Sequence, residues 1–413
     1  MGLMIPLFIL VLAIIFSLSF LLFMGVIYFE LSNSDIPPGL DGGGKLRIVH
    51  TIMIAIAITG KILENFGLCS QIGFTRYVRE RLMIRKLGED PKLFIKDLQF
   101  DNVPVRIYQP KSPSAGGRKG VLFFHGGGFM FGSIGTYDPL CRYISKETES
   151  VVVSVGYRLT PEHRYPTQFE DCLNATVHFL NTAQEYGVDS SSVIIAGDSA
   201  GGNLAAVVCQ SLVNRTDLPK PLAQVLIYPA VQMIDFNLPS YQQNRAVPPL
   251  YRERAAFYWL NYLCDDMLIM EEMLDGDHVP VDLKLMYRKW LSADNIPDEF
   301  KARGYKPRVM SSHADDVNEA VKCALEATCS PLIAEDSVFC MQPKAYILTC
   351  EFDVLRDDGL LYKKRLEDNG VPVTWHHVKN GFHGIFSIFS KGNFLFPSGK
   401  LAFDNIADFI KNV

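Results

Sequence analysis

The 413-residue sequence predicts an α/β fold with a mostly parallel central sheet, a helical cap and an apolar N-terminal helix. From about residue 103, short apolar runs alternate with helical patterns, which is typical of a parallel sheet covered by helices on both faces. Between about residues 235 and 335 the alternation stops, and a polar and aromatic helical segment follows. The sequence begins with a long uncharged apolar stretch. These three features define the expected architecture.

The N-terminal stretch has no charged residue from Leu3 to Phe29 and is predicted to be a transmembrane signal-anchor over residues 1–29. A helix of about 27 residues reaches roughly 40 Å, and the hydrocarbon core is roughly 30 Å thick. A cleaved signal peptide, with a shorter apolar region and a basic start, is one alternative, and a buried core helix is another. Pro6 occupies a position where a myristoylation motif has Ser or Thr, so a lipid anchor at Gly2 has weak support.

Two glycosylation sequons give mild support for a lumenal body. Asn214 begins the triplet Asn-Arg-Thr in a predicted loop, whereas Asn174 begins Asn-Ala-Thr within a helical pattern and is expected to be less accessible. Lys45 and Arg47 lie beyond several acidic residues, so the charge-bias rule decides little.

The linker SNSDIPPGLDGGGK leads to amphipathic helices between residues 46 and 95, so residues 30–95 are predicted to be a linker and N-terminal cap helices. The run TIMIAIAIT ends at Lys61 and Glu64, too early for a second membrane span. Residues 96–413 form the predicted main domain, with a cap insertion at about 235–335. Its strands are expected at VPVRIYQ, GVLFFHGGG, SVVVSVGYRL, SSVIIAGDSAG, AQVLIYPA, KAYILTCEFD and VTWHHVKN.

Composition narrows the possible partners. The chain is 48% hydrophobic with a net charge of −5 and no Lys/Arg-rich block, so nucleic acid is not an expected partner. The nine cysteines are scattered without C-x-x-C pairs or zinc spacing, which favours mostly buried thiols with room for one bridge. No metal or other cofactor is predicted, and no pattern sets an oligomeric state.

The stretch VIIAGDSAGG, residues 193–202, places Ser199 between Gly197 and Gly201, after a strand and before a helix. This is the setting of a G-x-S-x-G nucleophile elbow, in which the Ser turns sharply out of the sheet and its neighbours have no room for side chains. The alternative is a tight turn in which Ser199 only caps the helix.

The stretch FFHGGGF, residues 123–129, supplies backbone N–H groups for an oxyanion hole. We assign the hole to Gly126, Gly127 and the N–H of Ala200. The alternatives are a flexible hinge or a phosphate loop, and the second is disfavoured because no Gly-Lys-Ser/Thr follows. His125 precedes the glycines and is expected to be a structural hydrogen-bonding group.

A nucleophilic Ser needs a base, and in this architecture the acid and then the His follow the Ser along the chain. His383 lies in the glycine-flanked loop NGFHG after the last predicted strand, where an imidazole can approach Ser199. His376 and His377 lie within that strand and are expected to be packing or surface residues. His383 is therefore the predicted base.

The predicted acid is Asp353, at the C-terminal end of the strand KAYILTCEFD. It would hold the His383 tautomer and stabilise the imidazolium. Asp357 and Asp358 follow one turn later and are expected to cap the next helix.

Five ordered motifs, HGGGF, GYRLTPEHRYP, GDSAGG, EFDVLRDDG and NGFHG, resemble those of the hormone-sensitive-lipase (GDXG-type) group of α/β-hydrolases. With its N-terminal anchor, the chain resembles the arylacetamide deacetylase-like proteins over essentially its whole length. The resemblance implies an α/β-hydrolase fold and an esterase or amide hydrolase with a Ser199, Asp353 and His383 triad. It also implies a lid built from the N-terminal segment and the insertion, and a type II anchor in the endoplasmic reticulum with a lumenal catalytic domain.

Two details qualify the resemblance. Arylacetamide deacetylase carries a Cys just after its glycines, paired with one before the catalytic acid; here the first position is Met130 while Cys350 is present, which puts that bridge in doubt. In the YRLTPEHRYP motif, Arg158 and Glu162 are expected to form a buried structural pair.

Together these features predict a membrane-anchored serine hydrolase that cleaves esters or amides of lipophilic small molecules through an acyl-enzyme. A lipase acting on acylglycerols or cholesteryl esters is the enzymatic alternative, and a hydrolase-fold binding protein is the non-enzymatic one. Apolar helices between about residues 46 and 95 and the segment near YRERAAFYWLNYL are expected to cover the cleft above Ser199.

Overall fold

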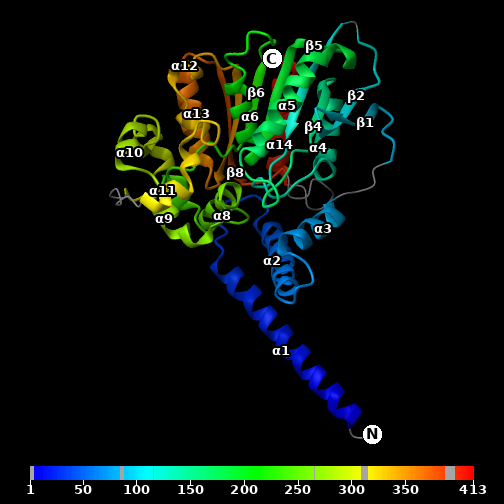
Figure 1. Ribbon diagram of the computed structural model, residues 1–413, viewed down its shortest axis with the longest axis vertical. Coiled ribbons are helices and arrows are strands. Elements are labelled where there is room, and N and C mark those ends of the chain that lie inside the picture. The colour runs from blue at the N-terminus through cyan, green and yellow to red at the C-terminus, as the bar shows by residue number, and fades with distance from the viewer. Residues whose placement is uncertain (1–3, 84–87, 115, 265, 308–314, 387–395) are drawn as a thin grey trace.

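The computed structural model describes residues 4–83, 88–114, 116–264, 266–307, 315–386 and 396–413. Parts of the predicted anchor, linker and insertion, at residues 1–3, 84–87, 265 and 308–314, lie outside the described residues. Figure 1 shows a central sheet flanked by helices, with one long helix projecting from the body. The fold is the α/β-hydrolase fold that the sequence predicts.

The sheet has eight strands in the order β1-β2-β4-β3-β5-β6-β7-β8. β1 pairs with β2 and β2 with β4 in antiparallel fashion, and the other five pairings are parallel. The seven strand positions predicted from the sequence are confirmed. The bounds of the strands are Leu93–Phe100 (β1), Val103–Pro110 (β2), Arg118–Phe124 (β3), Val151–Val155 (β4), Val188–Asp198 (β5), Ala223–Ile227 (β6), Lys344–Phe352 (β7) and Val373–Phe382 (β8).

Strand β1 was not expected, because the sequence pattern favoured helices up to residue 95. In β1 only Leu93 and Phe100, the two end residues, are buried, and the apolar residues between them follow no regular alternation. Pairing with β2 along all eight residues, from Leu93 opposite Pro110 to Phe100 opposite Val103, holds β1 at the edge of the sheet.

Helices cover both faces of the sheet, and the strands bury side chains toward both. α5 (Thr167–Thr182), α6 (Ala200–Ser211) and α13 (Arg356–Asp368) contribute to one buried cluster, and α4 (Ile134–Thr148) and α14 (Pro397–Asn412) to the other. Within β3, Leu122 and Phe124 belong to the first cluster and Val121 and Phe123 to the second. This alternation is the period-2 pattern of a strand buried on both faces.

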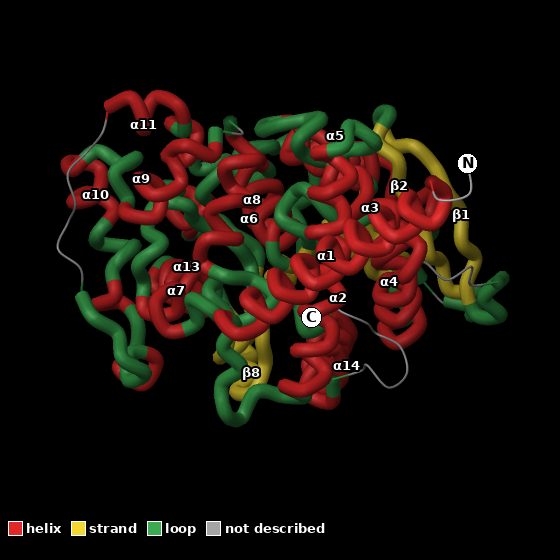
Figure 2. Tube along the Cα trace, turned by 90° about the horizontal axis from the view of Figure 1, so that it is seen from below, coloured by secondary structure: helices red, strands yellow, loops and turns green. Residues whose placement is uncertain are grey.

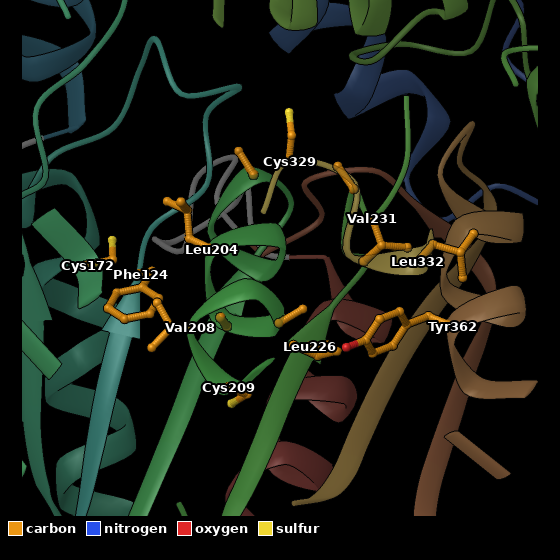
Figure 3. Close-up of a cluster of buried hydrophobic side chains, with 14 of the residues drawn as sticks. Phe124, Cys172, Leu204, Val208, Cys209, Leu226, Val231, Cys329, Leu332 and Tyr362 are labelled. Carbon is orange, nitrogen blue, oxygen red and sulfur yellow. The ribbon is translucent and has the colours of Figure 1, made fainter. Parts of the chain in front are cut away.

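Helix α6 runs directly from the predicted nucleophile, so its packing determines how firmly that residue is held. Figure 3 shows Leu204 and Val208, four residues apart on one side of α6, among Phe124 and Leu226 of the sheet. All four side chains are fully buried. Burying a side chain of this size contributes about 1.5–3 kcal/mol to the free energy of unfolding, so the start of α6 is held firmly against the sheet.

Helix α1 spans Met4–Asn33, and its apolar window over Phe8–Asn33 is 0% buried. It is long and apolar enough to cross a membrane. α2 (Gly43–Asn65) also meets that test by length and composition, but Leu46, Val49, His50 and Ile54 are buried against the body, and it packs on α3 (Gln71–Met83). Figure 1 shows α2 and α3 at the end of the body from which α1 projects, and Figure 2 shows this end from below, with α1, α2 and α3 in view.

The insertion between β6 and β7 is helical, as the sequence predicts. Its α-helices are α7 (Pro239–Gln243), α8 (Arg252–Leu263), α9 (Met270–Asp275), α10 (Val281–Tyr287), α11 (Asp315–Ala320) and α12 (Asp336–Phe339). Short 3₁₀ turns lie at Met267–Ile269, Ala293–Asn295, Asp298–Phe300, Lys322–Leu325 and Pro331–Ile333, and a further one, Ala183–Tyr186, follows α5.

All nine cysteines lie in the described residues, and no disulfide joins any of them. Five are buried, as expected, and only Cys69 and Cys340 are exposed. Met130, at the position where the resemblance would place a cysteine, is fully buried, and Cys350 is buried as a thiol. The one bridge that the sequence left room for is therefore not formed.

Candidate active site

Ser199 lies at the junction of β5 and α6 with φ 55° and ψ −121°, a strained conformation for a residue with a side chain. A Cβ atom on Gly197 would overlap the carbonyl oxygen of Gly201, and one on Gly201 would overlap that of Phe124. Both glycines are therefore required for the sharp turn. The Ser199 side chain accepts no capping hydrogen bond from its helix, so it does not act as the N-cap group considered from the sequence.

The structure brings Ser199, His383 and Asp353 together in one line. Ser199 Oγ lies 2.9 Å from His383 Nε2, and His383 Nδ1 lies 2.8 Å from Asp353 Oδ2. Asp353 is 1% exposed, and Ser199 and His383 are 9% and 8% exposed. A carboxylate on one ring nitrogen and a hydroxyl on the other is the arrangement by which an imidazole withdraws a proton from a Ser.

Asp353 and His383 are each held from a second side. The N–H of Leu355 donates to Asp353 Oδ1 at 2.9 Å, which leaves Oδ2 for the imidazole. The Tyr228 ring lies 4.9 Å from the His383 ring between centroids. The loop after β8 is thus fixed by contacts with residues that follow β6 and β7.

Asp357 and Asp358 do not cap helix α13, contrary to the sequence expectation. Asp357 Oδ2 accepts from the N–H of Ser240 at 2.6 Å, and Asp357 Oδ1 accepts from Arg356 Nε at 2.9 Å. Asp358 Oδ1 accepts from Gln232 Nε2 at 3.0 Å. Both carboxylates are fully buried and join α13 to the insertion, because partners from other segments outcompete the N–H groups of their own helix.

The oxyanion assignment to Gly126 is corrected by the structure. The N–H of Gly126 donates to Asp198 Oδ1 at 2.7 Å, so this donor is already used. The cavity that contains Ser199 and His383 is lined instead by Gly127, Gly128 and Ala200. Of the three residues assigned from the sequence, Gly127 and Ala200 therefore line this cavity, whereas Gly126 does not, and Gly128 lines it in addition.

Asp198 was not singled out from the sequence, although it precedes Ser199. It is 2% exposed and accepts from Tyr137 Oη at 2.9 Å as well as from Gly126. Burial raises the pKa of Asp198 from 3.8 to about 6, against the hydrogen bonds from Tyr137 and Gly126, which favour the ionised form. The only sequence signal was a polar residue at the end of a strand that is otherwise apolar.

His125 is a structural group, as the sequence predicts. It is buried, its Nδ1 lies 3.2 Å from Tyr157 Oη, and the Tyr157 hydroxyl donates to the His125 carbonyl at 2.6 Å. Burial lowers the pKa of His125 to about 4, so its ring is neutral at physiological pH. His377 Nε2 lies 3.1 Å from Glu351 Oε2, and His376 Nε2 lies 3.3 Å from Asn405 Nδ2. Neither pair includes Ser199.

The pair expected between Arg158 and Glu162 is wrong. Arg158 bonds to Asp171, with Nη2 2.7 Å from Oδ1, and Glu162 bonds to Arg76, with Oε1 2.8 Å from Nη1. The side chains of Arg158 and Glu162 are about half exposed. Arg76 also donates to the carbonyl oxygens of Met130 and Thr160 and so connects α3 to the glycine-rich loop.

The cavity above Ser199 encloses about 790 Å³, including the part open to solvent. Besides the glycine-rich loop, it is lined by Met53 of α2, Arg79 of α3, and Ala255 and Tyr258 of α8. Segments from the N-terminal helices and from the insertion thus share the wall of one cavity. Among the residues that the structure describes, no group of three or more His, Cys, Asp or Glu side chains is placed to bind a metal ion.

The two sequons differ in their surroundings. Asn214 is exposed in a turn after α6, whereas Asn174 is exposed on helix α5, where the hydroxyl of Thr176 is buried and donates to the Cys172 carbonyl. Both asparagines are exposed, so the expected preference for Asn214 rests on its position in a turn and stays a prediction.

Comparison with known proteins gives a consistent picture. The family described as alpha/beta hydrolase fold matches residues 121–275 and 300–387. The chain is 43% identical to human arylacetamide deacetylase-like 4, covering 95% of each chain, and 34% identical to bovine arylacetamide deacetylase, covering 90% of this chain and 94% of that one. A solved Pyrobaculum calidifontis esterase matches 86% of this chain and 97% of its own with a TM-score of 0.59 and 26% identity.

Proposed function

The chain belongs to the arylacetamide deacetylase-like proteins of the α/β-hydrolase fold and is a carboxylic ester hydrolase, and from this premise we propose that it is a membrane-anchored serine hydrolase of lipophilic esters or amides. Ser199 is the proposed nucleophile, His383 the base and Asp353 the acid. The observation that carries the proposal is the continuous hydrogen-bond chain from Ser199 Oγ through His383 to Asp353. Ser199 and His383 also line the cavity.

In the first half of the proposed reaction, Ser199 Oγ attacks the substrate carbonyl carbon while its proton moves to His383 Nε2. The imidazolium is stabilised by Asp353, and it then donates that proton to the leaving alcohol or amine as the acyl-enzyme forms. In the second half, water gives a proton to His383 and attacks the acyl carbonyl, which releases the acid and restores Ser199. The buried Asp353 supports this cycle because its charge is not screened by solvent.

We assign the oxyanion hole to the N–H groups of Gly127, Gly128 and Ala200. All three residues line the cavity with Ser199, and removing one donor of this kind costs roughly 2.7–4 kcal/mol in the transition state. Gly126 has a different role: its bond to Asp198 ties the glycine-rich loop to the strand that carries the nucleophile.

We further propose that residues 1–29 anchor the protein in the endoplasmic reticulum as a single-pass type II span with a lumenal catalytic domain. The exposed apolar helix α1 and the exposed sequon at Asn214 support this arrangement. In the proposed division, residues 30–95 and the insertion at about 235–335 form a cap over the hydrolase domain. Their shared lining of the cavity supports that division.

A fluorophosphonate probe tests the proposed nucleophile. Only a base-activated and accessible Ser reacts readily with such a probe, so the wild-type protein should be labelled and Ser199→Ala should not. Hydrolysis of p-nitrophenyl acetate should be lost in the same variant. Undiminished labelling of Ser199→Ala would transfer the nucleophile to another residue.

A further inference from the structure

A second chamber adjoins the catalytic cavity on the side of α2 and α3. It encloses about 770 Å³, including the part open to solvent, and its walls come from α2, α3, α8 and the end of the glycine-rich loop. Most of its lining is apolar, and Met53, Arg79 and Tyr258 line both this chamber and the catalytic cavity. The two spaces therefore share part of their walls.

The Tyr258 ring forms part of the wall between them. A Cβ atom on Gly128 would overlap this ring, so the ring lies directly on the backbone of the proposed oxyanion hole. Phe131 meets Tyr258 edge-to-face, with centroids 6.2 Å apart, and supports it from the other chamber. Tyr258 therefore lies at the boundary between the catalytic cavity and the second chamber.

The charges in the second chamber all have one sign. Arg79 and Arg254 are half-buried, and no acidic residue of the described chain lines the chamber. Among the described residues, Arg79 makes only a cation–π contact, 4.9 Å from the Phe131 ring, and Arg254 donates to the Pro249 carbonyl at 2.7 Å and stacks 4.7 Å from the Tyr251 ring. Neither guanidinium is paired with a carboxylate of the residues that the structure describes. By contrast, Arg76 is paired with Glu162 and Arg245 with Glu253.

From this combination we propose that the second chamber binds an anionic amphiphile, that is, an apolar chain that carries a carboxylate or phosphate group. The apolar lining would receive the chain, and the two half-buried guanidiniums would pair with the anionic group, which removes the unfavourable burial of uncompensated charge. The proposal rests on the proposed function in so far as it names a substrate class, namely esters whose lipophilic part ends in an anionic group.

The test compares two inhibitors that differ almost only in charge, octanoate and octanamide, against hydrolysis of p-nitrophenyl acetate by the full-length protein at pH 8. We expect octanoate to bind about tenfold more tightly than octanamide. The ratio of the two inhibition constants should fall toward one in Arg79→Gln and in Arg254→Gln. Each ratio is measured within a single variant, so a general loss of activity does not alter it.

Two further variants locate the effect. Ala57→Phe places a large ring in the second chamber, which Ala57 lines without lining the catalytic cavity, and should weaken both inhibitors. Arg245→Gln removes an exposed arginine that lines neither space and should leave the ratio unchanged. An equal affinity of the wild-type protein for octanoate and octanamide, or an unchanged ratio in Arg254→Gln, would overturn the proposal.

The anionic amphiphile has two possible sources, and the kinetics distinguish them. Competitive inhibition by octanoate assigns the chamber to the substrate or the released acid, whereas non-competitive inhibition assigns it to a separate lipid; both support the site. Equilibrium dialysis with labelled octanoate measures binding without turnover. If the protein hydrolysed no ester, the proposed function would fail while the chamber was still tested by dialysis.

Discussion

At the scale of single residues, two nearby aspartates have separate roles. Asp353 contacts His383, whereas Asp357 compensates the buried Arg356. We expect Asp353→Asn to lower kcat by roughly 10⁴ with the fold intact, because the imidazole loses its orienting partner. Asp357→Asn should instead destabilise the fold by about 1–3 kcal/mol, because the buried Arg356 loses one of its two carboxylate partners and keeps only Glu351.

Steady-state kinetics and thermal unfolding of both variants separate these roles. Asp353→Asn should retain the wild-type Tm, and Asp357→Asn should lower it. The reverse result, in which Asp357→Asn unfolds normally but loses turnover, would transfer the acid to Asp357.

Asp198 gives a pH-dependent prediction. Folding raises its pKa from 3.8 to about 6, so the folded state favours the protonated form. Its contribution to stability is fully present below pH 3.8 and is lost as the pH rises through about 6, a change of about 3 kcal/mol. The difference in unfolding free energy, wild type minus Asp198→Asn, should therefore fall by about this amount between pH 4 and pH 7.

Urea titrations of the two proteins at several pH values measure this difference. The asparagine variant supplies the control, because it carries the same side-chain shape without a titrating group. A difference that is constant with pH would mean that the Asp198 pKa is not raised by folding.

At the scale of elements, the glycine-rich loop depends on the helix that covers it. Gly128 has φ 62° and no space for a Cβ beneath Tyr258, whereas Gly304 has φ 83° and no atom within 4 Å of the position that a Cβ would take. Alanine at either position costs roughly 1 kcal/mol of backbone strain. Only Gly128→Ala should also displace the loop, and we expect it to lower kcat/KM by about 10²-fold or more.

The same loop offers a rescue experiment. Truncating the covering ring in Gly128→Ala/Tyr258→Ala should recover part of the lost kcat/KM, because the added methyl group then has space. Gly304→Ala should leave kcat/KM near the wild-type value. No recovery in the double variant would show that the strained φ, rather than the overlap with Tyr258, is the cause of the loss.

The strands show which elements of the sheet a local sequence pattern can predict. β5 and β7 were predicted because they contain the apolar runs VIIA and AYIL, which are typical of central strands buried on both faces. β1 was missed because LFIKDLQF does not alternate cleanly between apolar and polar residues, as a strand with one solvated face is expected to do. Its pairing with β2 depends on backbone hydrogen bonds, which leave no mark on side-chain pattern.

At the scale of the whole molecule, the anchor should affect delivery of substrate rather than chemistry. Figure 1 shows α1 projecting away from the body, and the N–H of Asp35 donates to the Ala246 carbonyl at 2.8 Å, which holds the chain after the helix to the body. Deleting residues 1–29 should therefore spare hydrolysis of soluble short esters and weaken attack on membrane-partitioned ones. Equal loss on both classes would show that the anchor is structural.

Glycosylation tests on which side of the membrane the catalytic domain lies. Protein made in mammalian cells should gain mobility on a gel after glycosidase treatment, and Asn214→Gln should remove most of that shift, because Asn214 is exposed in a turn. Asn174→Gln, on a helix, is the matched control and should change it little. An unglycosylated protein that is protease-sensitive in intact microsomes would place the body in the cytosol.

The sequence by itself determined the features that depend on close neighbours in the chain. The uncharged N-terminal run, the strand and helix periods, and the glycines on either side of Ser199 are local, because a steric turn or a hydrophobic face is defined within a few residues. Ser199, Asp353 and His383 directly follow β5, β7 and β8, and their proximity follows because the ends of parallel strands meet at one edge of the sheet.

Only the tertiary structure decided which polar partners meet. Gly126 is used by Asp198, Arg158 bonds to Asp171 rather than Glu162, and Asp357 reaches Ser240, more than a hundred residues away. The second chamber arises where α2, α3 and α8 converge, from segments about two hundred residues apart in the chain. A buried donor or acceptor must find a partner somewhere, but its choice depends on the groups that the fold brings within about 3 Å, and no local pattern encodes those distances.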